Sequence, residues 1–197
     1  VWEERGNLDD LLQAREIPLS KKLAGYYGIK NLRDSNRTAF PLYPSGDLGR
    51  QGLFTHPYLL ANYSYFNQTS PIHRGVFVSR KILGRHLRPP KEAISFKSSD
   101  FDPKWTMRQK VTALTKPANC MACHDLINST GFLLEGYDAT GRLRGKAAGK
   151  TPDTKVTYVD REGNELSMSG PAELLAHSLK SESSKIFFIE ELFKYVA

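Results

Sequence analysis

Cysteine is almost missing from this chain of 197 residues, since only two are present, and that excludes a small scaffold held together by several disulfides. No apolar stretch approaches the roughly 20 residues that a membrane-spanning helix needs, so we expect no membrane span. The net charge is +7, but the basic residues are scattered and no run of four occurs, so nucleic-acid binding is not expected. With 40% hydrophobic and 11% aromatic residues, the chain still has enough apolar surface for a core.

An initiator methionine and an export signal are also missing at the start of the chain, which reads Val1-Trp2-Glu3-Glu4. We interpret this opening as the interior of a longer protein, so it carries no information about the compartment. The chain is therefore expected to be one part of a larger parent protein.

The two cysteines lie three residues apart and a histidine follows directly, in Cys120-Met-Ala-Cys123-His124. This C-x-x-C-H pattern is the attachment signature of a c-type haem. Residues three apart share one face of a helix, so both sulfurs can reach the two vinyl groups on one porphyrin edge. The neutral imidazole of His124 is suited to be the proximal iron ligand. The sequence thus predicts one covalent haem c, held by Cys120, Cys123 and His124.

Two other interpretations of the cysteines are weaker. A thioredoxin-like redox pair needs a preceding strand and a βαβ frame, whereas Lys116-Pro117-Ala118-Asn119 precedes the motif. A zinc site needs four ligands, but there is no second cysteine pair and the remaining histidines show no H-x₃₋₅-H spacing. Because c-type haem is attached after export, we expect a periplasmic or otherwise extracytoplasmic protein.

Apolar periodicity and breaker residues predict a mainly α-helical chain with one small β-hairpin near residues 154–168. The expected helices lie within 7–27, near Pro57, from Ser70-Pro71 onward, within 105–115, and in two pieces after Pro171. Residues 30–49 are predicted to form a loop. We divide the chain into residues 1–95, a helical segment that covers the haem, and residues 96–197, which carry the haem motif and the C-terminal helices. Both parts are expected to form one compact unit.

A longer pattern surrounds the haem motif. Downstream of it, the pattern G-F-x-L-E-x-F-D-x-x-G-x-x-R is matched at Gly131, Phe132, Leu134, Glu135, Asp138, Gly141 and Arg144. Further matching elements are Leu23-Ala24 with Tyr27-Gly28-Ile29, Arg50-Gln-Gly52-Leu53, Thr69-Ser70-Pro71 with Arg74-Gly75, and Gly170-Pro171 with Glu173-Leu174. In these elements and their order the chain resembles the planctomycete-type cytochrome c domains, the C-terminal part of large exported haem c proteins. This resemblance implies a haem c domain of an exported protein.

The chain departs from the pattern of this family at Asn128-Ser129, where the family has Asp-Pro. The resemblance implies a turn after the haem helix. We therefore expect this turn to be capped differently here.

The sixth position of the iron leaves alternatives open. Methionine ligation raises the potential and suits electron transfer. Met168 follows the expected hairpin, which could bring its thioether over the distal face. The alternatives are His73, His56 and Tyr65, or an open or water-ligated iron.

Three arginines are candidates for contacts to the haem propionates. Arg74 lies in the matched Ser-Pro-x-x-Arg-Gly element and could hold a propionate through a charge-assisted pair. The equal alternative is a structural pair with a carboxylate such as Glu135 or Asp138. Arg142 and Arg144 have the same two interpretations.

Electron transfer is the expected function, with one haem that shuttles single electrons within or for a larger exported redox protein, rather than catalysis by this chain alone. The alternative is a haem enzyme or sensor whose open iron binds peroxide or a diatomic ligand, with His73 or His56 as distal acid or base. The expected partners are other domains of the parent chain or a redox protein, acidic in view of the +7 charge.

Overall fold

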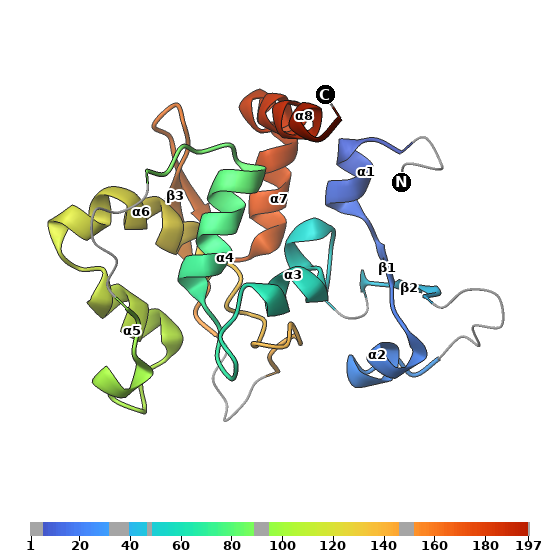
Figure 1. Ribbon diagram of the computed structural model, residues 1–197, viewed down its shortest axis with the longest axis horizontal. Helices are drawn as coiled ribbons and strands as arrows, with labels where there is room; N and C mark the ends of the chain where they lie inside the picture. The colour runs from blue at the N-terminus through green and yellow to red at the C-terminus, as the bar shows by residue number, and fades with distance from the viewer. Residues whose placement is uncertain (1–5, 32–39, 47–48, 89–94, 146–151, 197) are drawn as a thin grey trace.

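The computed structural model describes residues 6–31, 40–46, 49–88, 95–145 and 152–196 (Figure 1). These residues form a mainly helical fold with two small antiparallel sheets of two strands each, which confirms the predicted class. None of the helices within these ranges is both long and apolar enough to cross a bilayer. In chain order the elements are α1 (Leu8–Gln13), β1 (Glu16–Pro18), α2 (Lys21–Tyr26), β2 (Leu42–Pro44), the 3-10 turn η2 (Leu53–Thr55), α3 (Pro57–Asn62), α4 (Pro71–Phe77), the π-helical turn η3 (Val78–Ile82), the 3-10 turn η4 (Ser98–Asp100), α5 (Met107–Leu114), α6 (Ala118–Phe132), β3 (Val156–Val159), β4 (Glu165–Met168), α7 (Pro171–Lys180) and α8 (Glu182–Val196).

Local capping signals fix where α4 and α5, the two helices next to α6, begin. The Ser70 hydroxyl accepts a hydrogen bond from the main-chain N–H of His73 at 3.2 Å, and Pro71 occupies the first turn of α4. Thr106 and Gln109 form a reciprocal capping box at the start of α5. Both helices therefore begin where short polar residues satisfy the first free N–H groups.

The predicted hairpin is confirmed. Strands β3 and β4 pair in antiparallel register, with Val156 opposite Met168 and Val159 opposite Glu165. The turn contains Gly163 with a φ of 87°, a conformation that glycine adopts without steric cost.

Two expectations about local structure are wrong. Strand β2 lies inside the predicted loop 30–49 and pairs with β1, and the two strands place Ile17 and Tyr43 in a small cluster of buried side chains. Strands of three residues give no readable alternation, which is why the pattern missed them. The expected turn at Asn128-Ser129 is also absent, since α6 continues through Phe132. The Asn128 side chain forms hydrogen bonds with His124 and Thr115 and does not cap the helix. Because residue 129 is not a proline, the hydrogen bonds of the helix continue through this position.

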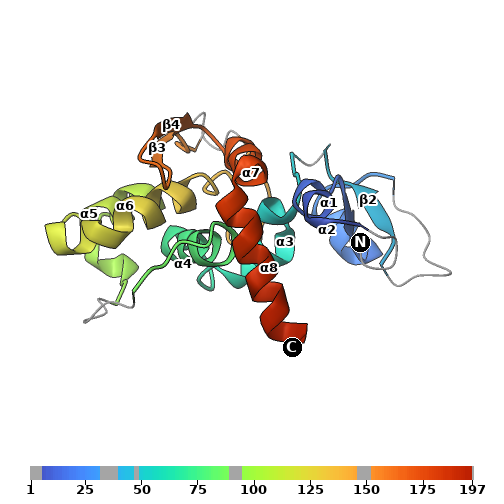
Figure 2. The same ribbon diagram turned by 90° about the horizontal axis from the view of Figure 1, so that it is seen from above.

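The main core lies where α4, α6, α7 and the hairpin meet, with Val78, Leu133, Met168 and Leu174 among its buried side chains (Figures 1 and 2). Helices α4 and α6 cross with their backbones almost in contact. A Cβ atom on Gly75 would lie 2.0 Å from the Ile127 carbonyl oxygen, and one on Gly131 would lie 2.0 Å from the Pro71 carbonyl oxygen. This crossing joins the two predicted segments 1–95 and 96–197, while the division between them stays a prediction.

Candidate functional site

The motif residues lie on the N-terminal half of α6, at one end of the molecule in Figure 1. Helix α5 ends at Leu114, and Pro117 then occupies the N-cap position of α6. Cys120, Cys123 and His124 are all half-buried, and both cysteines are free thiols. The structure thus brings two thiols and one imidazole onto a single turn of helix with access to solvent.

A chain of hydrogen bonds holds the imidazole of His124. Its Nδ1 lies 3.2 Å from Oδ1 of Asn128, one helical turn further on. The Asn128 amide donates to the Thr115 hydroxyl at 2.8 Å, and that hydroxyl donates to the main-chain carbonyl of Val111 at 2.8 Å. Asn128 and Thr115 are buried, at 7% and 3% exposure. Because Nδ1–H donates to the amide oxygen, Nε2 is left as the basic nitrogen that can bind a metal.

An open pocket of about 450 Å³ lies beside His124, between α5, α6 and β3. Its apolar surface comes from Met121, Phe132 and Val156, and its cations are Arg108 and Lys116. The Arg108 guanidinium lies 4.6 Å from the centre of the Phe132 ring and 3.4 Å from the Asp153 carboxylate. The remaining lining residues are Thr112, Thr115, His124, Asp125, Asn128, Ser129 and Thr157. Most of these lining residues are polar or charged, so the pocket offers hydrogen-bonding groups around a small apolar patch beside the imidazole.

The donor set fits a covalent haem better than the other two interpretations. Both sheets that the structure describes are antiparallel and α6 follows another helix, so the βαβ frame of a thioredoxin-like pair is not found there. Within the same residues no group of three or more His, Cys, Asp or Glu side chains is arranged to hold a metal ion. Two accessible thiols three residues apart, followed by an oriented imidazole, are what thioether attachment and axial ligation require.

The residues predicted for the sixth position of the iron lie in three different places in the structure. Met168 is 4% exposed within the main core and does not line the pocket at His124. His73 is exposed on α4, and its ring centre lies 5.3 Å from that of Tyr65, so these two candidates lie together. His56 is half-buried at the N-cap of α3, where burial and then the charge of Arg50 lower its pKa. Ligation of the iron by any of them stays a prediction.

Arg74 has the contacts of a structural residue. Its side chain is 1% exposed, and Nη1 lies 3.9 Å from the Glu135 carboxylate. Glu135 is one of the two carboxylates predicted as structural partners of Arg74. Burial lowers the pKa of Arg74 to about 10, while the charge of Glu135 opposes this shift. Its hydrogen bonds go to the carbonyls of Leu134, Tyr137, Leu60 and Asp138 at 3.0, 3.0, 3.0 and 2.7 Å and to the Ser64 hydroxyl at 3.0 Å. With these bonds to main-chain carbonyls the guanidinium fixes the segment that follows α6.

The other two arginines are exposed. The Arg142 guanidinium lies 5.1 Å from the centre of the Tyr26 ring, a cation–π contact at the end of α2. Arg144 lies two residues further on, and its main-chain N–H donates to the Gly136 carbonyl at 2.8 Å. Contacts of Arg142 and Arg144 to haem propionates stay predictions.

Sequence reasoning missed the residues that orient His124. Asn128 could have been found, because a residue four positions after a histidine shares its helix face and an amide can accept the Nδ1 proton. Thr115 gives no such signal, since its link to Asn128 depends on how α5 and α6 are joined.

A comparison with known families covers the centre of the chain. Residues 50–147 match the family model PSCyt3, described as a protein of unknown function (DUF1588). The matched segment contains α4, α6 and the haem motif. No curated protein and no solved structure gives a significant match.

Proposed function

Through residues 50–147 this chain belongs to the PSCyt3 family of planctomycete-type cytochrome c domains, and from this premise we propose that it is a monohaem c-type cytochrome domain. The proposed role is electron transfer within or for a larger exported redox protein. The observation that carries the proposal is the motif on α6, where two accessible thiols precede a histidine whose Nδ1 is held by Asn128.

Each motif residue has a defined task in this proposal. Cys120 and Cys123 would hold the porphyrin by thioether bonds, and His124 would bind the iron through Nε2. Asn128 and Thr115 fix the tautomer and the ring orientation of His124 and raise its basicity. A haem c group, when bound, supplies one-electron chemistry at its iron.

Expression together with a c-haem maturation system tests the cofactor. We expect the intact mass of the chain to increase by one haem, and the haem to stay on the chain in acid–acetone. Cys120→Ala and Cys123→Ala should each leave poorly loaded protein. Ala122→Ser is the matched control, because Ala122 lies between the two cysteines, is exposed and does not line the pocket at His124, so the change should not affect loading. An unmodified chain mass under these conditions would falsify the proposal.

The electron-transfer role and the sixth ligand are tested on the loaded protein. A redox titration should fit a single one-electron step. If Met168 binds the iron, the ferric protein should show the weak near-infrared band of sulfur ligation, and Met168→Leu should remove it. The leucine variant is preferred to alanine because Met168 is buried and leucine conserves most of its volume.

An open iron site is the second candidate, and one observation favours it: Met168 is packed in the main core and does not line the pocket at His124. In that case the protein would be a haem enzyme or sensor for peroxide or a diatomic ligand. Rapid binding of carbon monoxide by the ferrous form, with an unchanged spectrum in Met168→Leu, would support this candidate. A slow or absent reaction would support the six-coordinate electron carrier.

Export and an acidic redox partner belong to the same proposal. A c-type haem is attached outside the cytoplasm, and a net charge of +7 favours association with an acidic surface. The parent protein should therefore be found in an extracytoplasmic fraction. Electron transfer to an acidic partner should slow as salt is added, because salt screens the attraction between exposed charges.

A further inference from the structure

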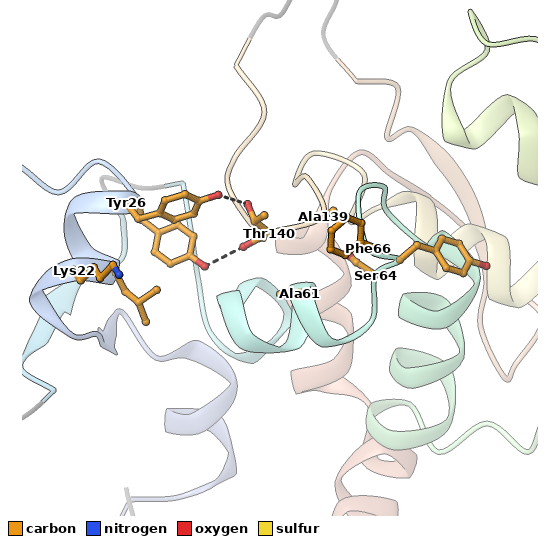
Figure 3. Close-up of a pocket in the computed structure, with 10 residues that line it drawn as sticks. Lys22, Tyr26, Ala61, Ser64, Phe66, Ala139 and Thr140 are labelled. Carbon is orange, nitrogen blue, oxygen red and sulfur yellow. Dashed lines mark hydrogen bonds between the residues drawn. The ribbon is translucent and has the colours of Figure 1, made fainter. Parts of the chain in front are cut away.

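A second groove lies between α2, α3 and two loops, away from the haem motif in sequence (Figure 3). Its volume is about 580 Å³, within the range of about 300–1,000 Å³ typical of small-molecule sites. The groove lies where the small buried cluster around Tyr43 adjoins the rest of the fold, since α2 contributes to that cluster through Ala24. We call it the tyrosine groove.

Aromatic side chains line two sides of the tyrosine groove. Tyr26 and Tyr27 form one side, with ring centres 5.2 Å apart and planes at 77°. Tyr65 and Phe66 contribute the other aromatic rings, and Phe66 is fully exposed. Between them the lining residues are small, Ala61, Ser64, Ala139 and Thr140. The guanidinium groups of Arg142 and Arg50 already lie over the rings of Tyr26 and Tyr27, and Tyr65 stacks on Phe96. The open ring is that of Phe66, and beside a floor of small side chains it suits a ligand with C–H groups on its faces.

The hydroxyl groups of the two tyrosines can only accept hydrogen bonds from a ligand. Tyr26 Oη donates to the Thr140 hydroxyl at 2.9 Å, and Tyr27 Oη donates to the Thr140 carbonyl at 2.9 Å (Figure 3). A phenol has a single proton, and in both residues that proton is already used. The lone pairs that remain on both oxygens can therefore accept hydrogen bonds from a ligand that brings O–H or N–H donors.

The charge of the tyrosine groove is positive. Lys22 is an exposed lining residue, and Arg142 lies over the ring of Tyr26. None of the residues that the structure shows lining the groove is acidic. The neighbouring Asp138 carboxylate already accepts hydrogen bonds from the hydroxyl and main-chain N–H of Thr140 and from the main-chain N–H of Arg142. An anionic group on the ligand would complement these cations.

We propose that the tyrosine groove binds an acidic oligosaccharide. A pyranose ring supplies a C–H face for the exposed Phe66 ring and hydroxyl donors for the two phenol oxygens, and a carboxylate or sulfate group supplies the charge for Lys22. A quinone fits less well, because it presents acceptors where the groove also has acceptors. The groove shares no residue with the motif or with the pocket at His124. Tyr65 is the one lining residue that is also an alternative for the sixth position of the iron, and it is left unchanged in the variants below.

Calorimetric titration of the haem-loaded chain with trigalacturonate tests the proposal. A sulfated galactose trisaccharide, titrated in parallel, distinguishes a carboxylate from a sulfate as the preferred anion. The methyl ester of trigalacturonate has the same sugar without the charge and should bind at least tenfold more weakly. Phe66→Ala should weaken binding tenfold or more, while Tyr26→Phe, which retains the ring and removes the acceptor oxygen, should weaken it severalfold.

Tyr58→Ala is the matched control, because Tyr58 is an exposed tyrosine on α3, at 68%, that does not line the groove. Its affinity should equal that of the wild type. The proposal is overturned if neither acidic trisaccharide binds, if the methyl ester binds as tightly as the acid, or if Phe66→Ala leaves the affinity unchanged. The visible spectrum should be the same in all variants, so failure of this proposal is separable from loss of the haem.

Discussion

The two halves of α6 differ in burial and packing, although they belong to one continuous helix. The first half, with Cys120, Cys123 and His124, is exposed or half-buried. The second half, from Ile127 to Phe132, is buried throughout and crosses α4 at backbone contact. Asn128 lies at the boundary, buried but with its side chain directed to His124.

This difference shows how one helix can hold a site rigidly and still leave it accessible to solvent. The buried half fixes the helix against α4, so that the exposed half is held in place without being covered. The hydrogen bonds from His124 through Asn128 to Thr115 then extend this rigidity to the imidazole. Substitutions in the two halves should therefore have effects of different kinds.

The largest effect is expected from Gly131→Ala in the buried half. The new methyl group would lie 2.0 Å from the Pro71 carbonyl, and main chain cannot move aside as a flexible side chain can. We expect a loss of about 3 kcal/mol or more in the free energy of unfolding, measured by urea denaturation. Gly136→Ala is the control, because a Cβ there meets no atom within 4 Å. Equal stability of the two variants would show that the crossing is looser than described.

An intermediate effect is expected from Asn128→Ala at the boundary. It removes the bond to His124 and leaves the Thr115 hydroxyl with one partner fewer, at a cost of about 1–3 kcal/mol. In the haem-loaded protein the imidazole would become a weaker donor, so the ferric form would lose stabilisation and the reduction potential would rise. A redox titration measures this shift. Ala122→Ser, in the exposed half and outside the pocket at His124, should change neither quantity.

The smallest effect is expected in acid, in the loop that follows the buried half. Partial burial opposes ionisation of Asp138, but hydrogen bonds from the Thr140 hydroxyl and from the main chain of Arg142 and Thr140 outweigh it and lower its pKa below the ordinary 3.8. The folded state therefore favours the ionised form of Asp138. The ionised carboxylate stabilises the fold above pH 3.8, and this stabilisation is lost as the pH falls through the lowered pKa. We expect about 1 kcal/mol or less.

Asp138→Asn should remove the part of the free energy of unfolding that depends on ionised Asp138. Urea denaturation of wild type and variant from pH 7 downward measures this free energy. The stability difference between wild type and variant should narrow as the pH falls below 3.8. A constant difference across this range would contradict the assigned hydrogen bonds.

The features that could be predicted from the sequence are those set by neighbouring residues in the chain. Ser70-Pro71 and the turn at Gly163 act within a few residues, so the start of α4 and the hairpin could be predicted. The pairing of Ile17 with Tyr43 joins two short strands across a long connection and has no local signal. The carboxylate partner of Arg74, Glu135, was among those predicted. Its main-chain partners were unpredictable for another reason, because every residue has a carbonyl group and its position depends on the fold.

The candidate site divides in the same way. Cys120, Cys123 and His124 were found by spacing alone, because the motif lies on about one turn of one helix. The contact between Asn128 and Thr115 depends on the angle between two helices, which no spacing encodes.

The close crossing of α4 and α6 also limits how this protein can vary over evolutionary time. A larger residue at position 75 or 131 would meet main-chain atoms, so no second substitution elsewhere can make room for it. Exposed positions between the cysteines, such as Met121 and Ala122, have no such restriction. A randomised library selected only for folded protein should therefore recover glycine at positions 75 and 131, and a wide range of residues at 121 and 122.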